Sequence, residues 1–285
     1  MTQTKKNTKI YKSKINKSKI NKSKINKSKI NKSKINKSNK TKSNKKTKSN
    51  KKHTLDKFVN KKLKTENVIV FNENNKNEIN YKDRKTNTFF NKLVGILNFS
   101  FEKEREYQIK KGSYYPGYKH NLNTIKNNLH SSNFDTYILT TKKMAPISLL
   151  YVEKNENDFD KIWTVCTDNK FRGQGMSSKL INFMITKQLN EKNPNRNTML
   201  LEVYNDHIIS REENDVKQSQ IMGLFGSKGF VNTEPKTLSD HSFNNLLSND
   251  GQTKIMVFNP KLWIQKNPKE NRKLNINAKN FIQSL

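Results

Sequence analysis

The distribution of apolar residues divides the chain into two regions of different character. In residues 12–36 the unit Lys-Ser-Lys-Ile-Asn occurs five times without interruption, so an isoleucine recurs at every fifth position. A step of five residues advances about 140° beyond one helical turn and changes face in a strand, so the isoleucines form no apolar stripe in either structure. Dense like charge and few apolar groups cannot offset the entropy of ordering. We therefore expect a disordered tail over residues 1–53, followed by a linker over 54–65.

Beyond the linker, the apolar residues follow the spacings of strands and helices. Short apolar and β-branched runs predict strands at 67–71, 137–140, 147–152, 161–167, 199–204 and 254–258. Apolar residues three and four apart predict helices at 88–99, 177–189 and 216–228. Residues 101–131 are polar and stay unassigned, except for a turn at 114–117. The order is an antiparallel meander followed by a strand–helix–strand unit. It predicts one α/β domain over 66–260, with a mixed sheet flanked by helices, and a basic extension over 261–285.

Charge is unevenly distributed along the chain. Residues 1–60 hold 22 lysines and one acidic residue, a net charge of 22 − 1 = +21 out of +33 for the whole chain. The remainder has 57 − 22 = 35 basic and 24 − 1 = 23 acidic residues, or +12. The expected domain is therefore only moderately basic, and the pI of the whole chain gives no information on its site.

The lysine-rich tail has two explanations, and both stay open. It can be an electrostatic arm that contacts nucleic acid or another polyanion without reading its sequence. It can also be the expansion of a coding repeat rich in adenine and thymine, whose codons encode lysine, asparagine and isoleucine. The repeats of 12–36 carry no aromatic residue or arginine that could stack on bases, so we expect no sequence-specific recognition.

The cysteine count and the apolar runs bear on the compartment. Cys166 is the single cysteine, which excludes an internal disulfide and fits a reducing compartment. The basic N-terminus has no apolar stretch behind it, and the apolar runs are too short to span a bilayer. We expect an intracellular, soluble protein, either cytoplasmic or nuclear. The five histidines and Cys166 form no cluster with metal-ligand spacing, so no metal is expected.

The segment from residue 161 to residue 178 carries the clearest chemical signal. A predicted strand leads through a polar loop into a glycine-containing turn and then a helix. The first N–H groups of a helix have no partner within the helix, and its dipole adds positive charge at the same end. Gly173 and Gly175 allow the backbone to approach an anion closely, and Arg172 supplies a cation. This arrangement predicts a binding site for a molecule with a pyrophosphate group.

Two common phosphate-binding patterns do not fit this turn. A P-loop requires Gly-x-x-x-x-Gly-Lys-Ser/Thr, which does not occur in the chain. A dinucleotide-binding turn requires Gly-x-Gly-x-x-Gly, but Ser178 stands where the third glycine belongs. The turn also follows several predicted strands instead of opening a βαβ repeat.

A third pattern fits. The run Arg172-Gly-Gln-Gly-Met-Ser177 resembles Arg/Gln-x-x-Gly-x-Gly/Ala, the acetyl-CoA signature of the GNAT superfamily of N-acetyltransferases. Residues 164–167 and 200–206 resemble the fourth and fifth strands of that superfamily. Residues 224–230 resemble its closing motif, Leu-Tyr-Glu-Lys-x-Gly-Phe. The resemblance is strongest over 161–230, extends over about 66–260, and does not include the tail.

The resemblance implies direct transfer of the acetyl group from acetyl-CoA to an amine of a protein or small molecule. Three strand residues would border the pantetheine arm: Val165, Cys166 and Thr167. Six residues of the turn would hold the pyrophosphate through main-chain N–H groups: Arg172, Gly173, Gln174, Gly175, Met176 and Ser177. A neutral amine is needed for attack, yet only about one alkylamine in a thousand is neutral at pH 7, so a base is required. Glu202 and Asp160 are candidate bases, and Tyr204 or a water is the candidate acid.

The chain also departs from the superfamily pattern. Phe225 occupies the position at which the closing motif usually has a tyrosine that acts as the acid, and His207 replaces a common asparagine. Phe225 keeps a second hypothesis open, that of a catalytically weak acyl-CoA-binding module which the lysine tail tethers to nucleic acid or another polyanion. Polar residues 211–215 form an expected insert beside the acceptor site. Trp163, Phe183 and Cys166 are predicted to pack in the core.

Overall fold

The computed structural model describes residues 54–102, 106, 119–131, 133–154, 159–191, 198–203, 211–233 and 254–285. The predicted tail over 1–53 and the predicted turn at 114–117 lie outside this part. No helix of the described part is long and apolar enough to cross a membrane.

The described strands form one mixed sheet in the order β1-β2-β3-β4-β5-β6-β8-β7. They are β1 (Val59–Lys62), β2 (Glu66–Phe71), β3 (Phe134–Thr141), β4 (Pro146–Lys154), β5 (Phe159–Thr167), β6 (Thr198–Val203), β7 (Phe230–Thr233) and β8 (Lys254–Phe258). Strands β1 to β5 form an antiparallel meander, and β5 pairs with β6 in parallel. The mixed sheet, the meander and the six predicted strands are thereby confirmed, although the last residue of the strand predicted at 199–204 lies outside the described part.

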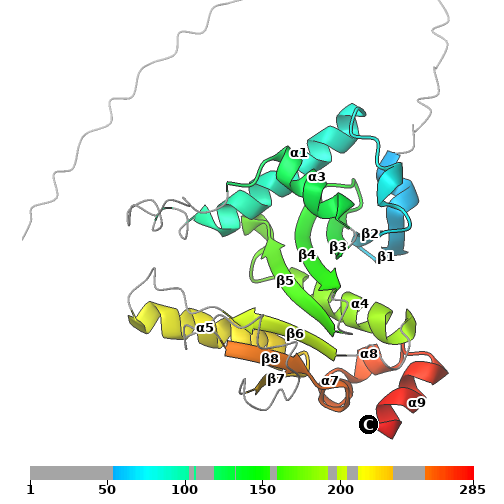
Figure 1. Ribbon diagram of the computed structural model, residues 1–285, viewed down its shortest axis with the longest axis vertical. Coiled ribbons are helices and arrows are strands. Elements are labelled where there is room, and N and C mark those ends of the chain that lie inside the picture. Colours follow the sequence, from blue (N-terminus) through cyan, green and yellow to red (C-terminus); the bar gives the residue numbers. More distant parts are fainter. Residues whose placement is uncertain are drawn as a thin grey trace, which may run out of the picture. The chain divides into compact units, whose positions relative to one another are not determined.

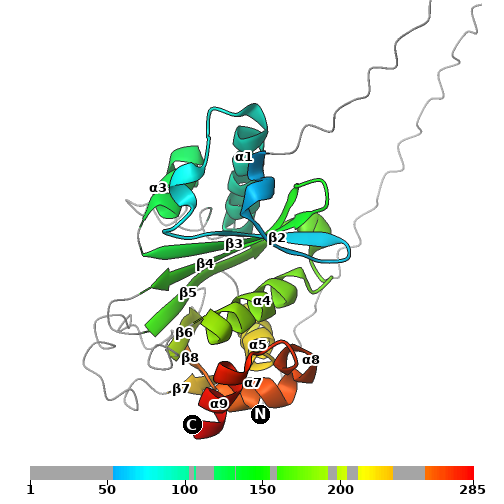
Figure 2. The ribbon, with the colours of Figure 1, turned by 90° about the vertical axis from the view of Figure 1, so that its right-hand side faces the viewer.

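Helices cover both faces of this sheet (Figures 1 and 2). They are α1 (Arg84–Ser100), α3 (Leu122–His130), α4 (Met176–Glu191), α5 (Arg211–Gly226), α7 (Pro260–Lys266), α8 (Pro268–Asn271) and α9 (Ile276–Ser284), with short 3-10 helices η1 (Thr54–Phe58), η2 (Lys76–Glu78) and η3 (Asn169–Phe171). The helices predicted at 88–99, 177–189 and 216–228 are present as α1, α4 and α5. Helix α5 begins at Arg211, so its first turn contains the expected polar insert.

The two faces of the sheet bury separate cores. Helices α1 and α3 pack on one face together with Ile69 and Phe71, and we call this the α1 core. Helix α4 packs on the other face with Val68 and Val70, and we call this the α4 core. Neighbouring residues of β2 thus point to opposite faces, as a pleated strand requires, and all of β2 is buried because both faces are covered.

The N-terminal boundary differs from the prediction of a linker over 54–65. Residues 54–62 instead form η1 and the edge strand β1, and Leu55 and Phe58 are buried in the α1 core. The Thr54 hydroxyl donates to Asp83 Oδ2 (2.8 Å). Charged residues among these few apolar ones obscured the signal in the sequence, and the described fold includes residues that the prediction assigned to a linker.

The residues after β8 are also an integral part of the fold. Helices α7, α8 and α9 follow β8, and the Trp263 side chain of α7 is fully buried in the α4 core. Asn275, the N-cap of α9, is bonded to Asn190 at the end of α4 by two hydrogen bonds (2.8 and 2.9 Å). Gly229 has φ 82°, and a Cβ there would lie 2.7 Å from the Trp263 Cβ. Close packing therefore explains the glycine of the closing motif.

The different burial of the two tryptophans predicts effects of very different size for the same substitution. Trp263→Ala removes a fully buried ring and should lower the free energy of unfolding by about 3–5 kcal/mol. Trp163→Ala removes a ring that is 54% exposed and should cost about 1 kcal/mol or less. Urea unfolding of the two variants beside the parent chain measures both changes. Equal destabilisation by the two substitutions would contradict the packing of α7 against the α4 core.

Candidate functional site

Strand β5 contains a β-bulge at Trp163. Tyr151 of β4 pairs with Thr164, but the next residue, Val152, pairs with Ile162, so Trp163 is an extra residue in β5. A bulge bends its strand and increases the local twist. The pairing of β5 with β6, as far as the structure describes it, runs from Phe159 to Ile162 and ends where the bulge begins. Figure 1 shows the two strands adjacent at their beginnings and apart at their ends.

Beyond the bulge, main-chain groups of β5 face the side from which β6 has diverged. The N–H of Asp168 donates to Ile147 O (2.8 Å) and therefore points toward β4. Successive residues of an antiparallel strand point their N–H and C=O groups to opposite sides. Cys166 thus faces β4, whereas Val165 and Thr167 face away from it. The strand presents a polar edge of the kind that can pair with an extended chain of amides.

The glycine-containing turn lies at the end of the same strand. Gly173 and Gly175 have φ values of 73° and 72°, and a Cβ at either would meet no atom within 4 Å. The N–H of Lys179 bonds to Gly175 O (3.0 Å), so the N–H groups of residues 176–178 precede the hydrogen-bond ladder of α4. The space beside both glycines is open, and the positive end of a 16-residue helix adjoins it. The turn therefore has the shape and charge of an anion site.

Hydroxyl groups join the turn to the sheet. The buried Ser148 hydroxyl of β4 donates to Cys166 O (2.6 Å) and lies 3.0 Å from Thr167 Oγ1. Thr167 Oγ1 in turn lies 2.6 Å from Ser177 Oγ, in the first turn of α4. This chain of contacts fixes the start of α4 relative to the edge of β5. The sequence pattern indicated a small residue at 177 and gave no sign of these contacts.

The Arg172 side chain joins the turn to α1. Its guanidinium donates to Thr167 O (3.2 Å) and Ser100 Oγ (3.3 Å) and lies 5.0 Å from the centre of the Phe99 ring. The N–H groups of Arg172 and Gln174 bond within the turn, to Asn169 O and Phe171 O. The sequence predicts that Arg172 acts as a cation for the pyrophosphate. In this structure, the N–H groups of the two glycines and of the first residues of α4 could donate to such an anion.

Glu202, the first candidate base, is part of a buried ion pair. Its Oε1 lies 3.1 Å from Lys161 Nζ, and the two side chains are 3% and 6% exposed. Lys161 Nζ also lies 4.6 Å from the centre of the Trp163 ring. Asp160, the other candidate base, is also buried. Tyr204 and His207 lie outside the described residues.

Three aromatic residues differ in how the structure places them. Trp163 is exposed, which corrects the prediction of a core residue, because the bulge interrupts the alternation of buried and exposed positions. Phe183 packs against the α4 core, with its ring edge-on to Tyr137, as expected. Phe225 is buried, and its ring lies edge-on to Phe230. The position that usually carries the tyrosine acid of the closing motif is therefore a core position.

Cys166 is a buried residue of the α1 core. Burial raises the pKa of its thiol from 9.0 to about 11. The thiol is protonated near neutral pH in both the folded and the unfolded chain, and ionisation destabilises the fold as the pH rises from 9 to 11. Nucleophilic cysteines have the opposite property, a lowered pKa and an exposed sulfur. Cys166 therefore has the properties of a packing residue.

These properties predict that Cys166 is unreactive in the folded protein. At pH 8 we expect Cys166 of the folded chain to react with iodoacetamide at least about a hundredfold more slowly than Cys166 of the chain unfolded in urea. In the folded chain a smaller fraction of the thiol is ionised, and the sulfur is buried. Cys166→Ala should retain any acyl transfer, since direct attack by an amine requires no acyl-cysteine. Intact mass after alkylation and a turnover assay measure the two quantities. Rapid labelling of the folded chain, or loss of turnover in a folded Cys166→Ala variant, would contradict this assignment.

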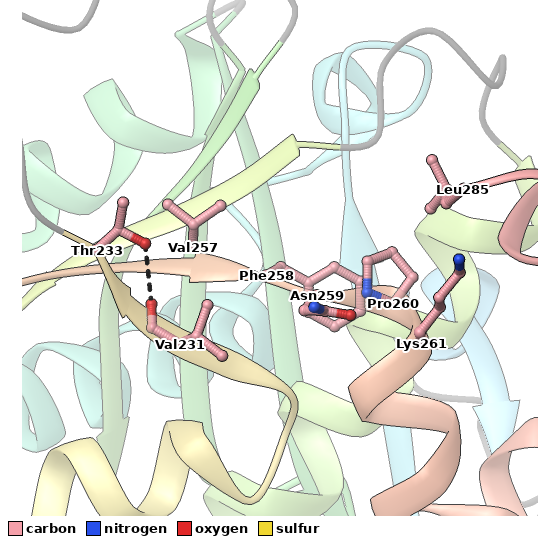
Figure 3. A pocket seen from close by; sticks show the side chains of 8 residues that line it. All are labelled: Val231, Thr233, Val257, Phe258, Asn259, Pro260, Lys261 and Leu285. Carbon is pink, nitrogen blue, oxygen red and sulfur yellow. Dashed lines mark hydrogen bonds between the residues drawn. The ribbon is translucent and has the colours of Figure 1, made fainter. Parts of the chain in front are cut away.

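A separate hollow of about 310 Å³ lies on the β7 side of the sheet (Figure 3). Its lining consists of Val231, Thr233, Val257, Phe258, Asn259, Pro260, Lys261 and Leu285. None of these residues belongs to β5 or to the glycine-containing turn, so the hollow is not part of the site. Among the described residues, no group of three or more histidine, cysteine, aspartate or glutamate side chains could hold a metal ion.

Comparisons with known proteins find similar chains only among solved structures. No protein-family model and no curated protein sequence matches the chain. A GNAT-family acetyltransferase from Staphylococcus aureus Mu50 is 12% identical, with 68% of this chain and 98% of that one covered and a TM-score of 0.42. Tetrahymena GCN5 is 10% identical over 66% of this chain and 92% of its own (TM-score 0.42), and a spermidine N-acetyltransferase from Vibrio cholerae is 16% identical over 50% and 74% (TM-score 0.35).

Proposed function

We propose that this protein transfers the acetyl group of acetyl-CoA directly to an amine. One observation supports this most strongly: a glycine-containing turn with open space beside it leads into α4, at the end of the strand whose bulge separates it from β6. A pyrophosphate and an amide-containing arm are joined in this order in CoA. The distance along β5 from Thr167 to the bulge is about 13 Å, at roughly 3.3 Å per residue. The edge of β5 is therefore long enough to lie beside most of the amide-containing arm.

The residues of the chain divide the binding between them. The N–H groups of Gly173, Gly175 and the first residues of α4 would hold the pyrophosphate. The main-chain groups of Val165 and Thr167 would pair with the pantetheine amides. Cys166 would contribute only as the residue between them, since its main chain faces β4 and its side chain lies in the α1 core. When bound, acetyl-CoA supplies an acyl group activated as a thioester.

An acceptor amine must lose a proton before it attacks. Its pKa of about 10 leaves roughly one molecule in a thousand neutral at pH 7. Glu202 is close to the bulge, but its side chain is only 3% exposed and is paired with Lys161, so a solvated amine does not reach it directly. We therefore infer that proton transfer to Glu202 passes through water rather than through direct contact. Tyr204, two residues further along the chain, remains the proposed acid because Phe225 has no proton to donate.

A thiol-release assay with a panel of amines tests the proposed reaction. The expected result is release of CoA that depends on, and saturates with, at least one amine from a panel of alkylamines, polyamines and lysine peptides. A chain shortened to residues 54–285 keeps Thr54 and its contacts and should give the same result with small amines. Absence of amine-dependent release with every member of the panel, from a protein that binds acetyl-CoA, would favour the binding-module hypothesis that Phe225 keeps open.

A further inference from the structure

The lysines of the tail are the largest feature that the proposed function leaves unused. Residues 1–53 contain 21 lysines and no acidic residue, and ten of these lysines stand in five identical repeats. Each lysine ε-amine is a primary alkylamine, which is the chemical class of acceptor that the proposed reaction needs. The tail is covalently joined to the domain, so its distance from the site can be estimated.

Contacts at the two ends of α1 give that distance. Thr54, where the described chain begins, contacts Thr86 near the start of α1, with 3.0 Å between the hydroxyl oxygens. At the other end of α1, Ser100 accepts a hydrogen bond from Arg172, the first residue of the glycine-containing turn. Fourteen residues separate Thr86 from Ser100, which is about 21 Å at 1.5 Å per helical residue. The turn therefore lies about 21 Å along α1 from the point at which the tail joins the domain.

The tail is much longer than this distance. The path from Thr54 to the turn and back along β5 to the bulge is about 21 Å plus about 13 Å. An extended chain covers about 3.3–3.6 Å per residue, so about ten residues are enough. Residues 1–53 are about five times that number. Most of the 21 lysines are therefore within tethered reach of the site.

The tail also joins the domain on a suitable face of the sheet. Leu55 and Phe58, immediately after the tail, are buried in the α1 core. The exposed Trp163 ring at the bulge lies edge-on to Phe134, which packs against the same core. The attachment point of the tail and the exposed side chain of the bulge thus lie on one face of the sheet.

We propose that the acceptors of the acetyl transfer include the lysines of residues 1–53 of the same chain. The proposal rests on the proposed function and names its substrate class. The neutral ε-nitrogen attacks the thioester carbonyl, a C–N bond forms, and the C–S bond breaks. The sulfur leaves and takes up a proton as the CoA thiol, while the nitrogen loses its proton to the base. Each transfer removes one positive charge from the tail.

Tethering has a kinetic consequence that separates this proposal from ordinary lysine acetylation. A tethered acceptor is present at an effective concentration on the order of a millimolar, independent of how much protein is in solution. The fraction of tail lysines acetylated per unit time should therefore stay constant when the protein is diluted tenfold. Acetylation of one molecule by another would slow tenfold over the same dilution.

The experiment uses the full-length protein, isotopically labelled acetyl-CoA and peptide mapping by mass spectrometry. Thioesters also acetylate lysines without an enzyme, so the exposed Lys254, Lys261 and Lys269 of the folded domain serve as an internal reference. We expect tail lysines to be labelled at least about tenfold faster than this reference. The excess should disappear in Gly175→Glu, which blocks the anion site, and persist in Gly223→Glu, which places the same charge on the exposed surface of α5. Gly173→Glu serves as the second blocked variant if Gly175→Glu does not fold.

The outcomes separate this proposal from the function on which it depends. Tail labelling no faster than the reference, while the chain of residues 54–285 still acetylates small amines, would overturn the proposal and leave the proposed function in place. Labelling that slows in proportion to dilution would overturn its intramolecular part. Failure of both the tail and all small amines to be acetylated would refute the proposed function itself. Fast, dilution-independent labelling that Gly175→Glu abolishes would support both.

Discussion

Gly175→Glu should weaken the binding of acetyl-CoA by about a thousandfold. A carboxylate at this position would stand beside the proposed pyrophosphate. Two like charges 4 Å apart repel by about 4 kcal/mol at an effective dielectric constant of 20. A Cβ at Gly175 meets no atom of the surrounding protein within 4 Å, so the added Cβ causes no steric clash. Its φ of 72° costs a non-glycine residue about 1–2 kcal/mol, which an otherwise intact fold can absorb. Isothermal titration calorimetry with acetyl-CoA measures the change.

Two matched variants separate charge from backbone strain. Gly175→Ala has the same strained φ without the charge and should lose far less affinity than Gly175→Glu. Gly223→Glu adds the same charge at an exposed position of α5, where a Cβ also has free space, and should bind like the parent chain. Unchanged affinity for acetyl-CoA in a folded Gly175→Glu variant would contradict the assignment of pyrophosphate binding to this turn. Equal losses in the alanine and glutamate variants would attribute the effect to strain alone.

The second large effect that we expect concerns nucleic acid: the charge of the lysine tail should make any binding to it strongly dependent on salt concentration. If six to ten lysines engage phosphates at once, the affinity for duplex DNA should fall by about a thousandfold or more between 50 and 200 mM salt. The slope of log K against log salt is roughly −0.9 for each phosphate neutralised. Lysine contacts to phosphate carry no sequence information, so two unrelated duplexes should bind equally. A salt titration of the full-length chain on both duplexes measures the slope and the preference.

The chain of residues 54–285 is the control for this measurement, because it lacks 21 lysines. We expect it to bind much more weakly and with a shallower salt slope. Equal binding by the shortened chain would place the polyanion site in the domain. A marked preference for one duplex would show sequence reading that the repeats cannot provide. No binding by the full-length chain at low salt would contradict a nucleic-acid role and favour the expansion of a coding repeat.

The parts of the fold that local sequence determines could be predicted. Strand β8 coincides with its prediction, and β2, β3, β4 and β5 contain theirs, because buried strands concentrate apolar residues in short runs. The turn could be predicted as well. Gly173 and Gly175 both have positive φ, and glycine adopts this conformation without steric cost.

The remaining features depend on contacts between distant residues. The bulge at Trp163 appears only in the register between β4 and β5, and the sequence alone led to a buried tryptophan. The Lys161–Glu202 pair joins neighbouring parallel strands that the sequence separates by 41 positions. Helix α3 buries only Ile125 and Leu129, which is too few for a clear periodic signal. The bulge and the ion pair matter most for the proposed site, because the proposed acceptor side lies where β5 and β6 diverge.

The most direct test of the proposed function is detection of the acetylated amine itself. CoA release can also come from hydrolysis of the thioester, whereas an amide can form only by transfer. With labelled acetyl-CoA and an accepted amine, mass spectrometry should find equal amounts of labelled amide and free CoA above the levels formed without enzyme, and Gly175→Glu should abolish both excesses. Bound acetyl-CoA with no amide on any amine, or CoA released without amide, would contradict acetyl transfer.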